Sequence, residues 1–333
     1  MPEPRILIID GTNTFLRNYA VNPTMDTNGK PIGGLVGTLR SVKFMIREVD
    51  AKRVYFVWDG EGGSKRRKGI FSEYKAGRKP RLNREFDHGN VEESRQNIEW
   101  QMQKTKDLLE HLGVTQIVVQ DVEADDVIGY LVGYLDPQPK VIVSSDKDMW
   151  QLVSNTTCVY WPTKEKYITT GNFAEVTDFP PYNYVLVRAM RGAADNADNI
   201  SGLKGLGDKT IKKIFGPDLE LPITLDQLVE KVEWYLKLDS EGKKKLKPTE
   251  KRWYKALLEG RDLVRQNVQL MQLSSPIISA NSAAIIRSAA DSRPTFQFTA
   301  FKLALMNNGI QLTDSDLMPT FKALQARTSH ANC

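Results

Sequence analysis

Cysteine and histidine are scarce in this chain of 333 residues, which contains two cysteines and three histidines. The cysteines, Cys158 and Cys333, cannot build a disulfide framework, and neither belongs to a CxxC metal-binding motif. The histidines, His88, His111 and His330, lie far apart in the sequence, which indicates neither a histidine-based zinc site nor a Ser–His–Asp triad. The chemistry of this chain has to come from other side chains.

Long apolar runs are absent as well. No stretch approaches the roughly 18 apolar residues of a membrane-spanning helix, so we expect no membrane partner. The N-terminus lacks the charged-then-apolar pattern of a signal peptide, and we expect a cytoplasmic protein. With 41% apolar and 26% charged residues, the composition is that of an ordinary globular protein. The length predicts two structural units, or one large core with an appendage.

Positive charge is unevenly distributed, although the formal net charge is only +5. Residues 64–84 contain nine Lys or Arg and a single acid, Glu73. Nine positive charges in so short a segment repel one another, and a polyanion such as nucleic acid relieves that repulsion. A second basic run at 243–255 is more typical of a solvated surface.

Acidic residues follow the apolar runs that we expect to form strands, at 5–9, 53–58, 116–119 and 140–145. Most of these runs precede a segment with helical periodicity, which predicts an α/β fold with a mostly parallel sheet and helices on both faces. The carboxyl ends of parallel strands share one edge, where ligands bind. Seven acids are therefore expected to converge there: Asp10, Asp59, Glu123, Asp125, Asp126, Asp146 and Asp148.

So many carboxylates at one edge raise one another's pKa and destabilise the fold unless cations neutralise them. Oxygen ligands favour Mg²⁺ or Mn²⁺ over zinc, and seven acids exceed the need of one ion. Two ions about 3.5–4 Å apart use more of them, and such pairs promote in-line attack on phosphodiesters. The alternative is that individual acids cap helices, and Asp125, Asp126 and Asp146 stand where caps belong.

Two further acids, Asp195 and Asp198, precede a basic, glycine-rich segment. Gly202, Gly205 and Gly207 open this segment, and backbone N–H groups at such a hairpin and helix N-terminus bind phosphates. The pattern predicts a helix–hairpin–helix motif that holds duplex DNA without reading its bases. Taken alone, the two acids favour an Asx-rich turn, and it is the glycine segment after them that changes this interpretation.

Seven motifs occur in order: Ile-Ile-Asp10-Gly, Val-Trp-Asp59-Gly, Tyr74-Lys75-x-x-Arg78, Glu123-Ala-Asp125-Asp126, Ser-Ser-Asp146-Lys-Asp148, Asp195-x-x-Asp198 and Gly202-x-x-Gly205-x-Gly207. This order resembles that of the structure-specific 5′ nucleases. That family includes flap endonucleases, the 5′–3′ exonuclease domain of bacterial DNA polymerase I, and phage enzymes of the ribonuclease H type. The resemblance covers roughly residues 5–215.

The resemblance implies a PIN-like α/β core that holds two Mg²⁺ ions, for which Mn²⁺ can substitute. It assigns Asp10, Asp59 and Asp125 to one ion and Asp146, Asp148, Asp195 and Asp198 to the other, with Glu123 and Asp126 adjoining. It also implies a K⁺ ion at the glycine hairpin.

A helical arch over the site, at about residues 60–100, is also implied, and a 5′ single strand passes through it. Lys75 and Arg78 would hold the scissile phosphate, while Tyr74 either stacks on a frayed base or packs in the core. The residues expected to contact DNA are Lys65, Arg66, Arg67, Lys68, Gly202, Lys204, Gly205, Gly207, Lys209, Thr210 and Lys212.

The chain is expected to divide into a nuclease core at 1–185, a helical helix–hairpin–helix region at 186–320, and a flexible tail at 321–333. The implied substrates are flapped, branched or nicked duplex DNA and RNA–DNA primer junctions, cut during replication and repair. The implied state is a monomer, with a sliding clamp or a single-strand-binding protein as partner.

Two other functions remain open at this point. A PIN-type ribonuclease acting on single-stranded RNA shares the sheet and the acids, but it does not explain the glycine hairpin or the basic segment. A non-catalytic DNA junction binder, whose acids are helix caps, explains the positive charge without any metal ion.

Overall fold

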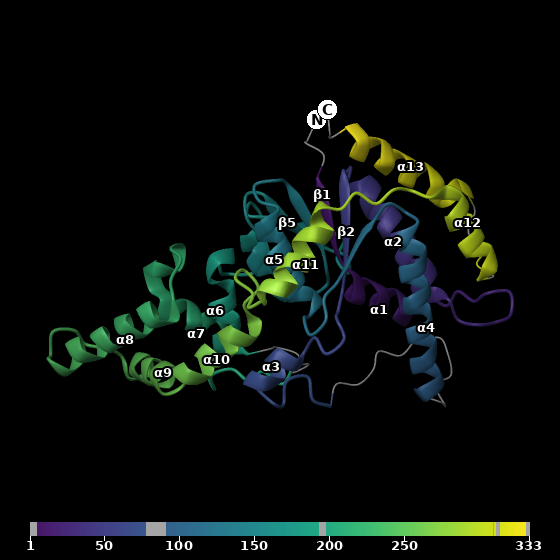
Figure 1. Cartoon of the computed structure of the whole chain (residues 1–333). Helices are drawn as coiled ribbons and strands as arrows, with labels where there is room; N and C mark the ends of the chain where they lie inside the picture. The colour runs from purple at the N-terminus through teal and green to yellow at the C-terminus, as the bar shows by residue number, and fades with distance from the viewer. Residues whose placement is uncertain (1–4, 78–90, 193–197, 309, 311–313, 331–333) are drawn as a thin grey trace.

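The fold is built around one six-stranded sheet in the strand order β3-β2-β1-β4-β5-β6. The computed structural model describes residues 5–77, 91–192, 198–308, 310 and 314–330 (Figure 1). The strands are β1 (Ile6–Asp10), β2 (Arg53–Trp58), β3 (Thr115–Val118), β4 (Lys140–Val143), β5 (Thr157–Trp161) and β6 (Lys166–Ile168). All neighbouring strands are parallel except β6, which runs antiparallel to β5. The predicted mostly parallel sheet is confirmed.

Strand β1 explains why the sheet has a core on each face. All five of its residues are buried, as expected for a central parallel strand covered on both sides. Because side chains alternate along a strand, Leu7 and Ile9 enter one core while Ile6 and Ile8 enter the other. The continuous apolar run in the sequence is therefore shared between two layers.

Helices cover both faces. The core that contains Leu7 is closed by α1 (Gly11–Val21), α2 (Gly33–Glu48) and α4 (Val91–Glu110). The core that contains Ile8 is closed by α5 (Ala124–Tyr134) and the short 3₁₀ helix η1 (Lys147–Leu152). Of the range in which we expected an arch, the structure describes α3 (Lys65–Ile70) and the first half of α4, whereas residues 78–90 lie outside the described residues.

A second helical unit follows the sheet. The short 3₁₀ helix η2 (Phe173–Glu175), whose Phe173 is buried in the core of the sheet, precedes this unit. The unit comprises α6 (Pro181–Arg191), α7 (Asp208–Phe215), η3 (Gly216–Glu220), α8 (Leu225–Ser240), α9 (Pro248–Glu259) and α10 (Arg261–Met271). Helices α6 to α10 surround an apolar core of their own, which includes Met190, Ile211 and Leu257. Figure 1 shows α8 and α9 at the end of this unit that lies farthest from the sheet.

The last three helices return to the α/β core, which differs from the expected single region at 186–320. They are α11 (Ala280–Asp291), α12 (Phe298–Asn307) and α13 (Asp314–His330). Ile286 of α11 is buried beside α5, and Phe301 and Phe321 are buried in the core of α2 and α4. Residues 321–330 are helical and their apolar side chains cover the core, in place of the flexible tail expected there. Within the described residues, none of the helices is both long and apolar enough to cross a membrane.

Candidate active site

The acids at the ends of β1 and β2 are fixed by hydrogen bonds at the carboxyl edge of the sheet. Asp10 accepts hydrogen bonds from the Asn13 backbone N–H at 3.1 Å and from Ser144 Oγ at 2.8 Å. Asp59 accepts one from the backbone N–H of Ala124 at 2.8 Å, in the first turn of α5. The ends of β1, β2 and β4 and the start of α5 are thereby tied together.

The pKa of Asp10 is raised to about 7, mainly by burial and also by the negative charges of Asp59 and Asp146. The hydrogen bonds from Asn13 and Ser144 act in the opposite direction, because they stabilise the ionised form. Carboxylates from three separate segments thus face one another closely enough to resist ionisation together.

Asp146 and Asp148 bring a third segment to the same place. Asp146 caps η1 by accepting the Asp148 backbone N–H at 2.8 Å, so it acts as a helix cap and an acid of the cluster at once. Although Asp146 reaches solvent, the surrounding protein desolvates it enough to raise its pKa, and Asp125 adds to the rise. Burial likewise raises the pKa of Asp148 to about 7, with Asp146 and Asp198 contributing.

Arg188 of α6 is a member of the site that the sequence did not reveal. Its Nε donates to Asp148 Oδ1 at 2.8 Å, and both side chains are largely buried. The signal was an arginine on the buried face of an amphipathic helix, next to Tyr184 and Val187. A buried cation without an acidic partner is costly, so this position signals a nearby carboxylate, although it does not indicate which one.

Arg67 lies inside the acidic cluster and not on the surface where we expected it to meet DNA. Its side chain is 1% exposed, and it donates to Asp125 Oδ1 at 3.1 Å and to Asp126 Oδ1 at 3.0 Å. It also pairs with Glu123 and donates to the Leu270 carbonyl of α10 at 2.8 Å. All of these partners are protein groups, which leaves the guanidinium buried away from any DNA strand.

The other cations of α3 have different positions. Arg66 is partly buried and reaches Asp126 Oδ2 at 3.2 Å, which adds to the neutralisation of that carboxylate. The pKa of Asp126 is raised to about 6, because burial and the charge of Asp125 outweigh the opposing effect of Arg67 and Arg66. Lys65 and Lys68 are exposed and so remain accessible to a polyanion.

Tyr74 and Lys75 close one side of the cluster. The Tyr74 ring is buried against Ile200 and Leu270, and its hydroxyl donates to Glu123 Oε2 at 3.2 Å. This position matches the core-packing alternative and leaves no ring face open for stacking on a base. Lys75 Nζ donates to Glu123 Oε1 at 2.9 Å. Burial by itself lowers the pKa of Lys75, but Glu123, Asp125 and Asp198 outweigh it and raise the pKa.

The loop that carries Asp198 is joined to the segment that carries Lys75. The Lys75 backbone N–H donates to the Asp198 carbonyl at 3.4 Å, and Asn199 Nδ2 donates to the Glu73 carbonyl at 2.7 Å. Asp198 is therefore placed beside the cluster, and its charge acts on both Lys75 and Asp148. Asp195 and Arg78 lie outside the described residues.

The glycine segment forms a tight hairpin between α6 and α7. Leu203 and Leu206 are buried in the helical unit, whereas Lys204, Gly205, Gly207 and Lys209 are exposed. A Cβ atom on Gly202 would lie 2.0 Å from the Arg191 carbonyl oxygen, so this position requires glycine. Gly205 has a φ of +81° and Gly207 is the N-cap of α7, which leaves the first N–H groups of that helix facing solvent.

Two residues of α7 differ in exposure. Lys212 is exposed and lies 3.5 Å from Asp178, and Thr210 is half-buried with its backbone N–H bonded to the Gly207 carbonyl. Helices α6 and α7 and the hairpin between them have the arrangement that suits backbone phosphates.

Oxygen is the donor atom that every acid of the cluster offers, which suits Mg²⁺ or Mn²⁺. Within the described residues, which omit Asp195, no group of three or more His, Cys, Asp or Glu side chains is arranged to hold a metal ion. Protein cations occupy part of the cluster, with Arg67 on Glu123 and Asp126 and with Arg188 on Asp148.

Comparison with known proteins gives one consistent result. Residues 5–178 match the family model of the 5′-3′ exonuclease, N-terminal resolvase-like domain. The chain is 29% identical over 295 residues to a 5′-3′ exonuclease of Halalkalibacterium halodurans, which covers 85% of this chain and 88% of that protein. It is 30% identical over 217 residues to the thermostable DNA polymerase I of Thermus thermophilus, of which it spans 24%.

Among solved structures, the bacteriophage T5 flap endonuclease in a pseudo-enzyme-product complex with DNA and metal ions superposes with a TM-score of 0.62. The sequence identity is 17%, and the match covers 91% of this chain and 98% of that one. The likeness confirms the expected PIN-like fold, and it extends beyond the sheet to the helical unit.

Proposed function

We propose a reaction for this chain from its family: the chain belongs to the 5′-3′ exonuclease family, whose N-terminal, resolvase-like domain it contains. On that premise it is a nuclease, a hydrolase of nucleic-acid phosphodiesters. We propose that it is a structure-specific 5′ nuclease that depends on Mg²⁺ and cuts near the 5′ end of flapped, nicked or primer-bearing duplexes. Such an activity serves primer removal in DNA replication and repair.

The observation that carries the proposal is the convergence of acids from five segments beside a glycine hairpin. The charges of Asp59 and Asp146 raise the pKa of Asp10, and the charge of Asp125 raises the pKa of Asp59. The charge of Asp198 likewise raises the pKa of Asp148. Structural caps have no need to meet at one edge and raise one another's pKa, whereas a site for divalent cations requires it. The junction-binder alternative does not explain why carboxylates that destabilise one another's ionised form lie so close together.

Arg67 divides the acids into two groups. Arg67 pairs with Glu123, Asp125 and Asp126, but the Glu123 and Asp126 side chains are buried with it, at 7% and 3% exposure, whereas the Asp125 side chain is 25% exposed. We therefore leave Glu123 and Asp126 out of the ligand set and keep Asp125. The ligands we propose for two Mg²⁺ ions are Asp10, Asp59, Asp125, Asp146, Asp148 and Asp198, with Asp195 as a seventh. When bound, the ions supply an activated water and stabilise the leaving oxygen. Mn²⁺ has the same ligand preference and substitutes for Mg²⁺.

The hydrolysis needs no nucleophilic side chain. Water attacks the phosphorus in line, the bond to the 3′ oxygen breaks, and the products carry a 5′ phosphate and a 3′ hydroxyl. Lys75 stands at the edge of the acids with its Nζ on Glu123, and we assign it to orienting the scissile phosphate, together with Arg78. Arg188 holds Asp148 in a fixed orientation.

The glycine hairpin binds the duplex next to the cleavage site. Its exposed N–H groups and the side chains of Lys204 and Lys209 contact backbone phosphates, and Lys65 and Lys68 contact the 5′ strand. The same proposal includes a K⁺ ion at the hairpin, a monomeric state, and a sliding clamp or single-strand-binding protein as partner. Exchange of K⁺ for Li⁺ in a duplex-binding assay tests the first of these.

Product mapping tests the proposed function. A 5′-labelled flap substrate is incubated with the protein with and without Mg²⁺, beside an RNA–DNA hybrid and a single-stranded RNA hairpin. We expect Mg²⁺-dependent products cut near the junction, with a 3′ hydroxyl on the released strand. Cutting of the RNA hairpin alone supports the ribonuclease alternative, and no cutting with intact duplex binding supports the junction binder.

A further inference from the structure

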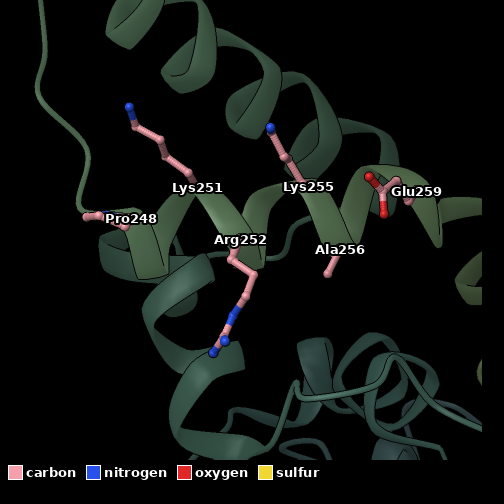
Figure 2. Close-up of a pocket in the computed structure, with 6 residues that line it drawn as sticks. All are labelled: Pro248, Lys251, Arg252, Lys255, Ala256 and Glu259. Atoms are coloured by element: carbon pink, nitrogen blue, oxygen red, sulfur yellow. The ribbon is translucent and has the colours of Figure 1, made fainter.

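The outward face of α9 carries a cavity of about 380 Å³ that the site above does not use. It is lined by Pro248, Lys251, Arg252, Lys255, Ala256 and Glu259. Their spacing of three and four residues places them along one face of the helix. In Figure 2, Lys251 and Lys255 extend to one side of α9 and Arg252 extends to the other, so the cavity lies between positive side chains.

Some lysines around α8 and α9 form ion pairs with neighbouring acids, whereas others, such as Lys245, take part in none within the described residues. Lys251 pairs with Asp239 at 2.5 Å and Lys243 pairs with Glu241 at 2.7 Å. Arg252 and Lys255 are exposed, and neither takes part in an ion pair within the described residues. The basic run therefore contains cations that are paired with acids and cations that are not, and Arg252 and Lys255 are the unpaired cations that α9 carries at the cavity.

Helix α9 adjoins the helix that follows the glycine hairpin. Ile211 and Ile214 of α7 share an apolar core with Leu257 of α9. Lys213 Nζ lies 5.3 Å from the centre of the Trp253 ring, which joins the two helices at the surface. Because α9 lies at the end of the helical unit far from the sheet, its cations extend the basic surface of α7 away from the acids (Figure 1).

We propose that Arg252 and Lys255 form a second contact site for backbone phosphates of the duplex arm that the glycine hairpin holds. The inference rests on the proposed function and deepens it. The ligand class is duplex DNA phosphate, because two exposed, uncompensated cations on either side of one helix suit regularly spaced anions without base contacts. Glu259, at the C-terminal end of the same helix, opposes this attraction.

The test measures duplex affinity as a function of arm length and salt. Binding of the wild type and of the double variant Arg252→Ala/Lys255→Ala is compared on flap substrates whose duplex arms are about 10 and about 30 base pairs, roughly one and three helical turns. Lys243→Ala/Lys245→Ala is the matched control, because it removes two exposed positive charges from the loop before α9. Glu259→Gln tests the opposite change, because it removes a negative charge from the same helix.

On the long arm, we expect the double variant to bind more weakly and its log Kd–log salt slope to fall by about 2, close to one per lost phosphate contact. On the short arm we expect the double variant to bind like the wild type. The control variant is expected to keep wild-type affinity on both arms, and Glu259→Gln is expected to bind the long arm more tightly. An unchanged slope for the double variant, or an equal loss in the control, overturns the inference. Neither result affects the proposed function, which fails only if the wild type does not cleave the flap.

Discussion

Arg67 Nη2 donates to Asp126 Oδ1 at 3.0 Å, and this pair is buried between the basic helix α3 and the first turn of α5. The same guanidinium reaches the Leu270 carbonyl of α10. One side chain therefore connects the segment that leads into the expected arch, the acidic cluster and the helical unit. Loss of this side chain would break all three connections at once.

Arg67→Met keeps a side chain of similar length but removes the charge. We expect the free energy of unfolding to fall by about 3–5 kcal/mol, the usual cost of leaving a buried ionic partner uncompensated. Urea denaturation without divalent ions measures it. Lys65→Ala is the control, because Lys65 is exposed and lies 3.6 Å from Asp121, and it is expected to change stability by no more than about 0.5 kcal/mol. A loss for Arg67→Met as small as that of the control contradicts the assigned role.

The metal-free protein is expected to lose stability as the pH rises. Burial raises the pKa of Asp10 and of Asp148 to about 7, so the folded state holds protons that the unfolded chain has already released. Between the ordinary value near 4 and pH 7, each such group lowers the unfolding free energy by up to about 1.4 kcal/mol per pH unit. Thermal melts at pH 5 and pH 7.5 measure this.

Two controls accompany the melts. Addition of Mg²⁺ at pH 7.5 is expected to restore the melting temperature, because divalent ions neutralise the ionised acids. Asp10→Asn/Asp148→Asn is expected to flatten the pH dependence of the metal-free protein. A wild-type melting temperature that increases steadily from pH 5 to pH 7.5 argues against the close approach of these acids.

Asp146→Asn is expected to abolish cleavage while sparing DNA binding. The amide keeps the oxygen that caps η1, so the local fold survives, but it removes a charge worth several kcal/mol to the transition state, or about 10³ in rate. Single-turnover cleavage of a flap substrate measures the loss. Asp121→Asn, at an exposed acid outside the cluster, is expected to cleave normally, and an Asp146→Asn variant at wild-type rate excludes Asp146 from the mechanism.

Lys75→Ala is expected to slow the chemical step more than it weakens duplex binding. Lys75 lies at the acids, whereas the hairpin that we propose to bind the duplex is left intact by the change. Single-turnover rates at saturating enzyme separate the two effects. Lys164→Ala, at an exposed lysine in the turn between β5 and β6, is the control. Equal single-turnover rates for Lys75→Ala and the wild type remove Lys75 from the mechanism.

Gly202→Ala is expected to weaken duplex binding by distorting the hairpin. The new methyl group would meet the Arg191 carbonyl, so the backbone has to move, at a cost of more than about 1 kcal/mol. Gly133→Ala is the control, because a Cβ at Gly133 in α5 meets open space, and helix propensity favours alanine there by up to about 1 kcal/mol. Melting temperatures and duplex affinities of both variants measure the difference. Wild-type affinity for Gly202→Ala contradicts the assigned role of the hairpin.

The convergence of Asp10, Asp59 and Asp146 was predictable, because strand periodicity and the geometry of parallel sheets locate strand ends without knowledge of side-chain packing. The positions of Arg67 and Arg188 were not, since a buried arginine is defined by partners far away in the sequence. Runs of basic residues look alike in a sequence whether their charges are exposed or paired.

The helix that contains Phe321 illustrates a different limit. A C-terminal segment is commonly frayed, and its sequence alone does not indicate that it covers the core beside α2. The buried arginines and this C-terminal helix both depend on partners that are distant in the sequence. Local pattern determines where helices and strands form, and tertiary contacts determine which side chains they bury.

The most direct test of the account is to count divalent ions on the intact protein. Calorimetric titration with Mn²⁺, with Mg²⁺ as competitor, is carried out on the wild type and on Asp59→Asn and Asp146→Asn. We expect two saturable sites in the wild type and weaker or fewer sites in each variant. If the wild type binds no divalent ion, or if both variants bind exactly as it does, the acids of the sheet edge are not a metal site.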